Sequence, residues 1–285
     1  MGLPMARRLT AAGFAVYAYD AAPGREQTAR EHGIAWAGSA ADATRAAAGL
    51  AIVMVRTLPQ VREAVLGESG CLAAGVDGAT LIVMSTIDPD SMAAIAAEAS
   101  ARGATILDAP VSGGRKGAED GTLAIMAAGP ADAIASVEPV LSQLGSHVVN
   151  VGPQAGHGQA VKLANQALMA AAMAGTLEGL QIARRYGVEE STALSVLAHG
   201  TGGGWVVRNW DWMRELWEEY ETGNALDVLY KDMRALLEAA AGSWMPLPVA
   251  SASFQQLLAH WTAQPAVGEA HHLRGPDLSF GSGAA

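Results

Sequence analysis

The hydrophobic residues in the first half of the chain come in short runs that alternate with helical segments. Strands buried on both faces of a parallel sheet read as continuous apolar runs, and helices connect them. The runs predict strands at residues 15–19, 34–36, 51–55, 81–84, 105–107, 123–127 and 147–149. Helices are expected between them, at residues 4–12, 25–32, 40–48, 61–66, 89–102 and 131–144. The pattern therefore predicts an α/β domain with a doubly wound parallel sheet.

The alternation ends near Gly152 and Pro153, and no further strand is expected after them. A helix at residues 158–186 would be about 40 Å long, which is enough to connect two domains. Further helices are expected at residues 190–198, 206–219, 226–241 and 248–261, with a turn at 202–204 and a loosely ordered tail after 263. We therefore expect two domains, residues 1–152 with the sheet and residues 153–285 with helices alone.

The composition argues against several classes of function. The net charge is −10 and no long basic run occurs, which disfavours nucleic acids and anionic membrane surfaces as partners. Cys71 is the only cysteine, so an intramolecular disulfide or a cysteine metal cluster cannot form, and a reducing cytoplasm is the simplest location. The most apolar helical stretch, residues 167–174, is too short to cross a bilayer, and no signal peptide is recognised. We expect a cytoplasmic protein with a small-molecule partner.

A glycine-dense segment, residues 108–123, directly follows an apolar strand. Pro110 lacks an N–H group and cannot continue the ladder. Gly113 and Gly114 permit backbone conformations that other residues resist. Such a segment can direct its backbone amides and the Ser112 hydroxyl at an anion. A glycine-rich hairpin before the next strand is the alternative interpretation.

The first residues, Met1 and Gly2, are typical of the end of a dinucleotide-binding turn that leads into a helix. In a complete motif the glycines let a pyrophosphate approach the helix N-terminus. The strand and the first two glycines of that motif are not in the sequence, and a helix that simply starts at Pro4 is the alternative. We expect about ten residues of the motif to be missing, which would leave a gap in the sheet flanked by unpaired edges.

Three later strand ends are expected to face the same ligand, because ligands of doubly wound sheets lie at the carboxyl ends of the strands. Asp20 ends the first strand and can accept hydrogen bonds from a ribose, which favours NAD; a turn aspartate is the alternative, and Arg25 leaves NADP possible. Leu58 and Pro59 follow the third strand. Thr86 follows the fourth, where an N-terminal turn of the next helix is the alternative.

The start of the long helix carries a candidate catalytic lysine. Lys162, Asn165 and Gln166 are spaced i, i+3 and i+4, so they share a face of the helix. The apolar neighbours of Lys162 predict partial burial, and burial in general lowers the pKa of a lysine towards neutrality, which suits proton transfer. An ordinary surface lysine is the alternative.

Other polar residues carry weaker signals. His157 lies between two glycines and is expected to be a loop or cap residue, and His271 and His272 lack further ligands at metal spacing, so no metal site is expected. Lys231 and Asp232 are either a solvated ion pair or a means of directing Lys231 into a cleft between the domains.

Five motifs in one order resemble the β-hydroxyacid dehydrogenase family, which includes 3-hydroxyisobutyrate dehydrogenase and tartronate semialdehyde reductase. They are residues 1–6, Ser-Thr-Ile-Asp-Pro at 85–89, the segment 108–123, residues 156–166 and the Lys-Asp pair at 231–232. The resemblance covers essentially the whole chain. It implies a Rossmann-type domain followed by an all-helical domain joined by a long helix, and oxidation of a small 3-hydroxy acid, or reduction of its semialdehyde, with NAD or NADP. Similar imine reductases usually replace the lysine, so Lys162 argues against them.

The resemblance also assigns roles to residues. It implies that Lys162 is the catalytic lysine, which accepts the hydroxyl proton during oxidation and donates it during reduction. Substrate-binding residues would be Ser112, Gly113 and Gly114 at the carboxylate, with Asn165 or Gln166 orienting the lysine or the hydroxyl. Cofactor-binding residues would be Met1, Gly2, Asp20, Leu58, Pro59, Thr86 and Lys231. The Lys-Leu-Ala-Asn-Gln sequence at 162–166 is similar to the tartronate semialdehyde branch, whereas Asp20 is similar to the NAD-preferring hydroxyisobutyrate branch.

Two further expectations concern partners. The alanine- and methionine-rich long helix can pack against a second subunit, so a homodimer or homotetramer is expected. A non-catalytic nucleotide- or metabolite-binding protein is the competing hypothesis, supported by the incomplete dinucleotide motif and opposed by Lys162 with Ser112. Binding of NADH without turnover of any 3-hydroxy acid or semialdehyde would favour it.

Overall fold

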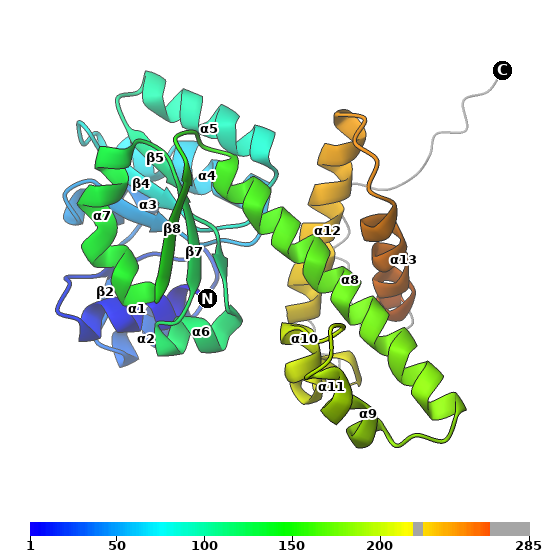
Figure 1. Cartoon of the computed structure of the whole chain (residues 1–285). Helices are drawn as coiled ribbons and strands as arrows, with labels where there is room; N and C mark the ends of the chain where they lie inside the picture. Colours follow the sequence, from blue (N-terminus) through cyan, green and yellow to red (C-terminus); the bar gives the residue numbers. More distant parts are fainter. Residues whose placement is uncertain (219–224, 263–285) are drawn as a thin grey trace. The chain divides into compact units, whose positions relative to one another are not determined.

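A computed structural model describes residues 1–218 and 225–262 of the chain, which folds as two compact units (Figure 1). Unit 1 comprises Met1–Asn165 and unit 2 comprises Gln166–Ala285. The division falls inside one continuous helix, because the first turns of this helix pack within unit 1. The predicted domain boundary after residue 152 stays a prediction.

Unit 1 is built on a six-stranded sheet in which β3 (Leu50–Val53), β4 (Thr80–Val83) and β5 (Thr105–Asp108) run parallel and adjacent. Next to β5 lies β7 (Ala124–Ala128), which pairs antiparallel with β5 and with β6 (Val111–Ser112), and parallel with β8 (His147–Gly152). The predicted doubly wound α/β class is confirmed. The antiparallel pairing of β7 was not predicted, and it arises because the short helix after β6 turns the chain back on itself rather than carrying it over a face of the sheet.

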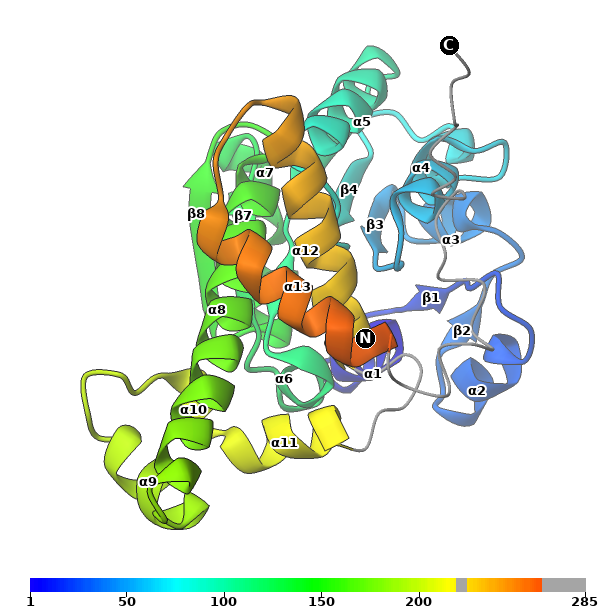
Figure 2. The same ribbon diagram turned by 90° about the vertical axis from the view of Figure 1, so that its right-hand side faces the viewer.

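A second, separate ladder consists of β1 (Tyr17–Ala18) and β2 (Ala35–Trp36), which pair in parallel. Among the described residues β1 forms no ladder with β3, and Figure 2 shows the two sheets as separate. In the described part of the chain, β1 and β3 each keep one edge without a strand partner.

Eight short helices accompany the strands of unit 1 in the described part of the chain. They are α1 (Gly2–Ala11), α2 (Arg25–Glu31), α3 (Ala40–Ala46), α4 (Leu58–Leu66), the 3₁₀ helix η1 (Cys71–Ala74), α5 (Pro89–Ala101), α6 (Gly114–Asp120) and α7 (Ala131–Leu144). Six of these helices correspond to predicted ones. The other two, η1 and α6, were not anticipated, and α6 lies within the segment expected to be a turn.

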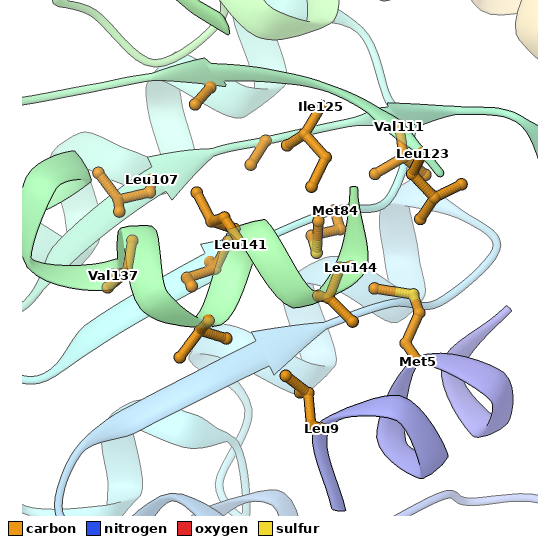
Figure 3. Packing of buried hydrophobic residues seen from close by; sticks show 14 of the residues in the cluster. Met5, Leu9, Met84, Leu107, Val111, Leu123, Ile125, Val137, Leu141 and Leu144 are labelled. Atoms are coloured by element: carbon orange, nitrogen blue, oxygen red, sulfur yellow. The ribbon is translucent and has the colours of Figure 1, made fainter. Parts of the chain in front are cut away.

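The core of unit 1 follows the two-residue period of its strands. On β4, Leu81 and Val83 belong to the cluster under α4 and α5, whereas Ile82 belongs to the cluster under α1 and α7. Successive side chains of a strand point to opposite faces, so one strand contributes to both layers. Figure 3 shows the second layer, where Met5 of α1 points towards Leu144 of α7. The sheet is thus covered on both faces, as the continuous apolar runs predict.

The described residues of unit 2 form helices joined by turns and short irregular segments, without a strand. It contains most of α8 (His157–Arg185), then α9 (Glu190–Leu197), α10 (Trp205–Arg208), α11 (Trp210–Glu218), α12 (Ala225–Gly242) and α13 (Pro248–Thr262). The single helix predicted at residues 206–219 is wrong, because the chain leaves the helical conformation at Asn209, whose side-chain amide donates to the carbonyl of Trp205 at 2.8 Å. Buried methionines, Met173, Met213 and Met233, form part of the core. None of the helices in residues 1–218 and 225–262 has the length and apolarity to cross a membrane.

Candidate active site

The start of α8 is attached to the end of β5 through one buried carboxylate. Oδ2 of Asp108 accepts hydrogen bonds from the backbone N–H of Gly156 at 2.8 Å and of Gln159 at 3.1 Å, and Oδ1 accepts from Gln159 Nε2 at 2.6 Å. Asp108 thereby caps α8 from another element, at the end of the helix where the dipole favours negative charge. Burial raises the pKa of Asp108 above its ordinary value, and the hydrogen bonds from Gln159, Gly156 and Gly158 oppose this shift.

Gln159 extends the same network to β4. Its Oε1 accepts from the backbone N–H of Ile87 at 3.0 Å, and its Nε2 donates to the carbonyl of Ser85 at 3.0 Å. The Ser85 hydroxyl in turn accepts from the backbone N–H of Val55 at 2.8 Å. Asp108 and Gln159 are both 0% exposed. The segments after β3, β4 and β5 and the first turn of α8 therefore form one hydrogen-bonded group within unit 1.

The sequence analysis did not identify Asp108 or Gln159 as part of the site. A signal exists for each, because Asp108 is a charged residue at the end of an apolar strand and Gln159 lies in the first turn of the long helix. Their pairing brings together residues 51 positions apart in the chain, which no local pattern indicates.

Two glycines allow α8 to approach the sheet this closely. A Cβ atom on Gly158 would lie 2.6 Å from the carbonyl oxygen of Met126 and 2.9 Å from that of Asp108. Gly156 has a φ of +102°, and a Cβ there would lie 2.8 Å from the carbonyl oxygen of Pro89. Any side chain at either position would push the helix away from the strand ends, so both glycines are needed for the packing.

Lys162 lies on α8 one turn after Gln159 and is 6% exposed, so its expected burial is confirmed. The two residues next to Lys162 in the chain differ in their exposure to solvent: Leu163 is 2% exposed and Val161 is 43% exposed. Asn165 lies on the same face of the helix and is half-buried. An ordinary surface lysine is excluded by this burial, while the catalytic role of Lys162 stays a prediction.

Gln166 belongs to unit 2, where it contacts the pair on α12. Its Nε2 donates to Asp232 Oδ2 at 2.8 Å, and Lys231 Nζ lies 2.7 Å from Asp232 Oδ1. The ion pair considered from the sequence forms, but its carboxylate is buried: the side chain of Asp232 is 0% exposed and that of Lys231 is 31% exposed. Asp232 was not predicted as a site residue, yet it orients both Gln166 and Lys231.

The glycine-dense segment contains both a hairpin and a helix. Ser112 pairs with Ala124 in the antiparallel ladder of β6 and β7, so the hairpin interpretation holds for the flanking strands. Gly113 and Gly114 follow with φ angles of +128° and +62°, and α6 begins at Gly114. Since only glycine adopts such angles without strain, these two residues are what allows the chain to turn from β6 into α6. Both are exposed, and Ser112 is half-buried.

The N-terminus of α1 fits an anionic group. The helix begins at Gly2, one position after Met1 and two before the predicted start, and a side chain at Gly2 would meet no atom within 4 Å. The pKa of the Met1 amino group is lowered by burial and then by the positive charges of Arg115 and Arg25. Arginine side chains and a helix N-terminus together create positive potential, which suits the phosphates of a dinucleotide.

The other predicted cofactor residues occupy the ends of three strands. Asp20 is exposed, and its Oδ1 accepts from the backbone N–H of Ala22 at 2.8 Å, so the turn interpretation is confirmed for one carboxylate oxygen. The second oxygen has no protein donor in the described part of the chain, which leaves it able to bind a ribose hydroxyl. Thr86 lies outside α5, because Asp88 is the residue that caps this helix by accepting from the N–H of Ser91.

Leu58 and Pro59 are the first residues of α4 rather than part of a loop. Thr57 caps the helix, and Gln60 completes a capping box by accepting from the backbone N–H of Thr57 at 3.2 Å. This arrangement fixes the first turn of α4 at the carboxyl end of β3. His157 is the first residue of α8, so it lies inside the helix and not in the loop or cap position expected for it. In the described residues no group of three His, Cys, Asp or Glu could hold a metal ion; His271 and His272 lie outside these residues, as does the tail after residue 263.

Comparison with known proteins decides the family. Residues 1–152 match the NAD binding domain of 6-phosphogluconate dehydrogenase, and residues 156–272 match the NAD-binding domain of NADP-dependent 3-hydroxyisobutyrate dehydrogenase. The chain belongs to the β-hydroxyacid dehydrogenase family. It is an NAD(P)-dependent hydroxyacid dehydrogenase, and the predicted class of enzyme and of cofactor are confirmed.

Several characterised dehydrogenases of the family are similar over most of their length. The NAD-dependent L-serine dehydrogenase of Pseudomonas aeruginosa is 34% identical over 88% of this chain and 86% of that protein. The L-threonate dehydrogenase of Cupriavidus necator is 33% identical over 92% of this chain and 88% of that protein. The 3-hydroxyisobutyrate dehydrogenase of P. aeruginosa is 36% identical over 73% of this chain and 69% of that protein.

Solved structures agree with the fold of this dehydrogenase. The 3-hydroxyisobutyrate dehydrogenase of Mycobacterium tuberculosis, determined with L-serine, has a TM-score of 0.81 at 28% identity and covers 92% of this chain and 91% of its own. An imine reductase of Myxococcus stipitatus has a TM-score of 0.64 at 19% identity, and the match covers 95% of this chain and 91% of that chain. The second likeness shows the fold alone.

Proposed function

We propose that this dehydrogenase oxidises a small 3-hydroxy acid to its semialdehyde, reversibly, with NAD in preference to NADP. The observation that carries the proposal is Lys162, a lysine 6% exposed on a helix whose first turn is attached to the ends of β4 and β5. A lysine kept largely out of water at the carboxyl edge of a doubly wound sheet is in the part of the fold where ligands bind. The substrates named for relatives, L-serine and 3-hydroxyisobutyrate among them, are carboxylic acids with a hydroxyl group nearby.

The proton chemistry is assigned to Lys162. During oxidation its neutral amine accepts the proton of the substrate hydroxyl while the C–H bond of the same carbon breaks and a carbonyl forms. In the reverse direction the ammonium group hydrogen-bonds the carbonyl oxygen and returns the proton. Bound NAD(P) supplies the hydride acceptor or donor at C4 of its nicotinamide. Asn165 is the residue that orients Lys162 or the hydroxyl, because the Gln166 amide is already bound to Asp232.

The carboxylate of the substrate is assigned to the turn at β6. The Ser112 hydroxyl and the backbone N–H groups of Gly113 and Gly114 are donors, and neither glycine has a side chain that would cover them. The cofactor is assigned to Met1 and Gly2 at its phosphates. Its remaining contacts are assigned to Asp20, Leu58, Pro59, Thr86 and Lys231. Asp20 supports NAD, since a carboxylate repels a 2′-phosphate.

A substrate panel with both cofactors tests this function. Purified protein is assayed with NAD and with NADP against 3-hydroxyisobutyrate, L-serine, L-threonate, 3-hydroxypropionate and glycerate, by following absorbance of the reduced nicotinamide. We expect turnover of at least one 3-hydroxy acid and a higher kcat/KM with NAD. Absence of turnover across the panel and across the matching semialdehydes, with NADH binding retained, would contradict the proposal and favour a binding protein.

We also propose that the enzyme is a cytoplasmic homodimer or homotetramer without nucleic-acid or membrane partners. Support for assembly comes from α8, where Val161, Leu168 and Ile182 recur at multiples of seven residues and are 43%, 72% and 63% exposed. Such spacing gives one apolar stripe along a helix, which is typical of a helix that packs against another. A reducing compartment is supported by the lone, buried Cys71, and the net charge of −10 disfavours polyanionic partners.

A further inference from the structure

The side-chain amide of Gln159 uses its hydrogen-bonding groups on three backbone or side-chain partners in unit 1. Oε1 accepts from Ile87 N at 3.0 Å, while Nε2 donates to the Ser85 carbonyl at 3.0 Å and to Asp108 Oδ1 at 2.6 Å. A carbonyl and a carboxylate can only accept, and a backbone N–H can only donate, so these partners fix which end of the amide is nitrogen. Gln159 therefore holds the residue before and the residue after Thr86.

The same side chain is rigidly connected to Lys162. Gln159 and Lys162 are three residues apart on α8, so they lie on neighbouring positions of one helix face. Asp108 also holds the backbone of α8 at Gln159 N, at 3.1 Å. Gln159, Ser85 and Ile87 are 0%, 1% and 3% exposed, so water does not compete for these hydrogen bonds. The position of Thr86 and the position of Lys162 are thus both determined by the conformation of one glutamine.

We propose that Gln159 is a positioning residue that fixes the separation between Thr86, which is assigned to the cofactor, and Lys162, which is assigned to the proton. The inference rests on the proposed function for these two roles. The hydride leaves the hydroxyl-bearing carbon while the proton leaves its oxygen, so the cofactor and the lysine must be aligned on the same group of the substrate. A displacement of about 1 Å costs on the order of 10²-fold in rate, even when the substituted residue does not contact the substrate.

A purely stabilising role for this network makes a different prediction. Buried hydrogen bonds in general lower the free energy of the folded state, and their loss would reduce the amount of folded enzyme without changing the folded site. A suitable control is Thr44, which is 0% exposed and whose hydroxyl donates to the carbonyl of Ala40 at 2.8 Å on α3. Thr44→Val removes a buried hydrogen bond from the same unit without involving the proposed site.

The main variant is Gln159→Met, which keeps the length of the side chain and removes all three hydrogen bonds. We expect kcat per folded protein to fall by about 10²-fold, with a larger primary isotope effect from substrate deuterated at the hydroxyl-bearing carbon. The Kd of NADH, measured by fluorescence titration, should rise, and the Ile87 amide should exchange with solvent faster because its acceptor is gone. Thr44→Val should lower the Tm and leave these three quantities unchanged.

A charge-conserving pair of substitutions keeps the test decisive if Gln159→Met does not fold. Gln159→Glu places two carboxylates together and loses both donors, whereas Asp108→Asn with Gln159→Glu restores a hydrogen bond between the two side chains with reversed polarity. We expect the double variant to recover part of the kcat that Gln159→Glu loses, which is the non-additivity expected of residues in direct contact. Additive losses would show that the two side chains do not act as a unit and would overturn the proposal.

The proposed function and this inference fail in different ways. If the wild type oxidises no acid of the panel, the function fails, while the Kd of NADH and the exchange rate of the Ile87 amide still report on positioning. If the wild type is active and Gln159→Met keeps its kcat, its isotope effect, its Kd of NADH and slow exchange at Ile87, the inference is wrong.

Discussion

Lys162 is 6% exposed and lies one turn after Gln159, whose side chain is hydrogen-bonded to the ends of β4 and β5, and this placement is the physical basis of its proposed role. Removing Lys162 should therefore affect chemistry more than binding. For Lys162→Ala we expect kcat to fall by at least about 10²-fold, the usual contribution of a positioned acid or base, with the Kd of NADH retained. Lys162→Arg should be similarly slow, because a guanidinium keeps its proton. Wild-type turnover in the arginine variant would contradict proton transfer by Lys162.

At Asp20 a single exposed carboxylate is expected to set the choice of cofactor. Asp20→Ser removes the charge that repels a 2′-phosphate, so the ratio of kcat/KM for NADP to that for NAD should rise by about tenfold, or about 1.4 kcal/mol. The matched control is Glu26→Ser on α2, which changes the net charge equally but removes a carboxylate paired with Arg30 at 2.7 Å. Equal shifts in both variants would mean that net charge, and not the position of Asp20, determines the preference.

Cys71 illustrates how burial suppresses reactivity. The side chain is buried in η1, and burial raises the pKa of its thiol above 9.0, with a smaller opposing contribution from Thr44. We expect the native enzyme at pH 8 to react with a thiol reagent such as DTNB far more slowly than the enzyme unfolded in guanidinium. Rapid labelling of the native protein would contradict this burial.

The same shift gives Cys71 a defined effect on stability. Because the folded state keeps the thiol proton more tightly than the unfolded state, the contribution is fully present below pH 9.0 and is lost as the pH rises towards the higher pKa of the folded state. The decrease in Tm between pH 8 and pH 10 should therefore be larger for the wild type than for Cys71→Ala. Equal decreases in Tm in the two proteins would show that this thiol does not contribute to the pH dependence of stability.

Among the elements, α4 connects local sequence to the site most directly. Thr57 and Gln60 form its capping box, and the next residues after the cap, Leu58 and Pro59, are assigned to the cofactor. Thr57→Ala should destabilise the protein by about 1 kcal/mol, lower the Tm by about 2–4 °C and weaken NADH binding. Ser136→Ala on α7, whose hydroxyl donates to the carbonyl of Ala133, removes an exposed hydroxyl and should change neither quantity. An unchanged Kd of NADH in Thr57→Ala would contradict the prediction that this cap supports the cofactor site.

Elements with a clear period and clear ends were predicted well. Helix α7 spans Ala131–Leu144 as expected, because Pro130 and Gly145 end it on either side and its apolar residues recur at helical spacing. Helix α6 was missed, since Gly114 and Gly117 argue locally against a helix. It forms in part because Gly117 packs against Leu123, where a Cβ would lie 3.1 Å from Cδ2. The break at Asn209 was likewise hidden within a continuous amphipathic pattern.

On the scale of the whole molecule, the exposed stripe of α8 is expected to be an interface between copies of the chain. Leu168→Glu places a charge in its centre and should shift the enzyme towards monomers, measured by light scattering after size-exclusion chromatography. The control is Val196→Glu on α9, a similarly exposed apolar residue at 67% that lies off the stripe. A wild type that is monomeric at all concentrations, or a Leu168→Glu variant that assembles normally, would contradict the interface.

The sequence by itself determined the alternation of strands and helices, the change to an all-helical second half, and the candidates Lys162, Ser112 and Asp20. These features depend on local periodicity, on turn-forming residues and on motifs that are contiguous in the chain. Only the tertiary structure showed that Asp108 caps α8 and that Gln159 hydrogen-bonds the residues on both sides of Thr86. It also showed that Asp232 accepts a hydrogen bond from Gln166 and pairs with Lys231. Buried polar side chains must find partners wherever the fold brings them, and those partners are distant in sequence, so no local pattern reveals them.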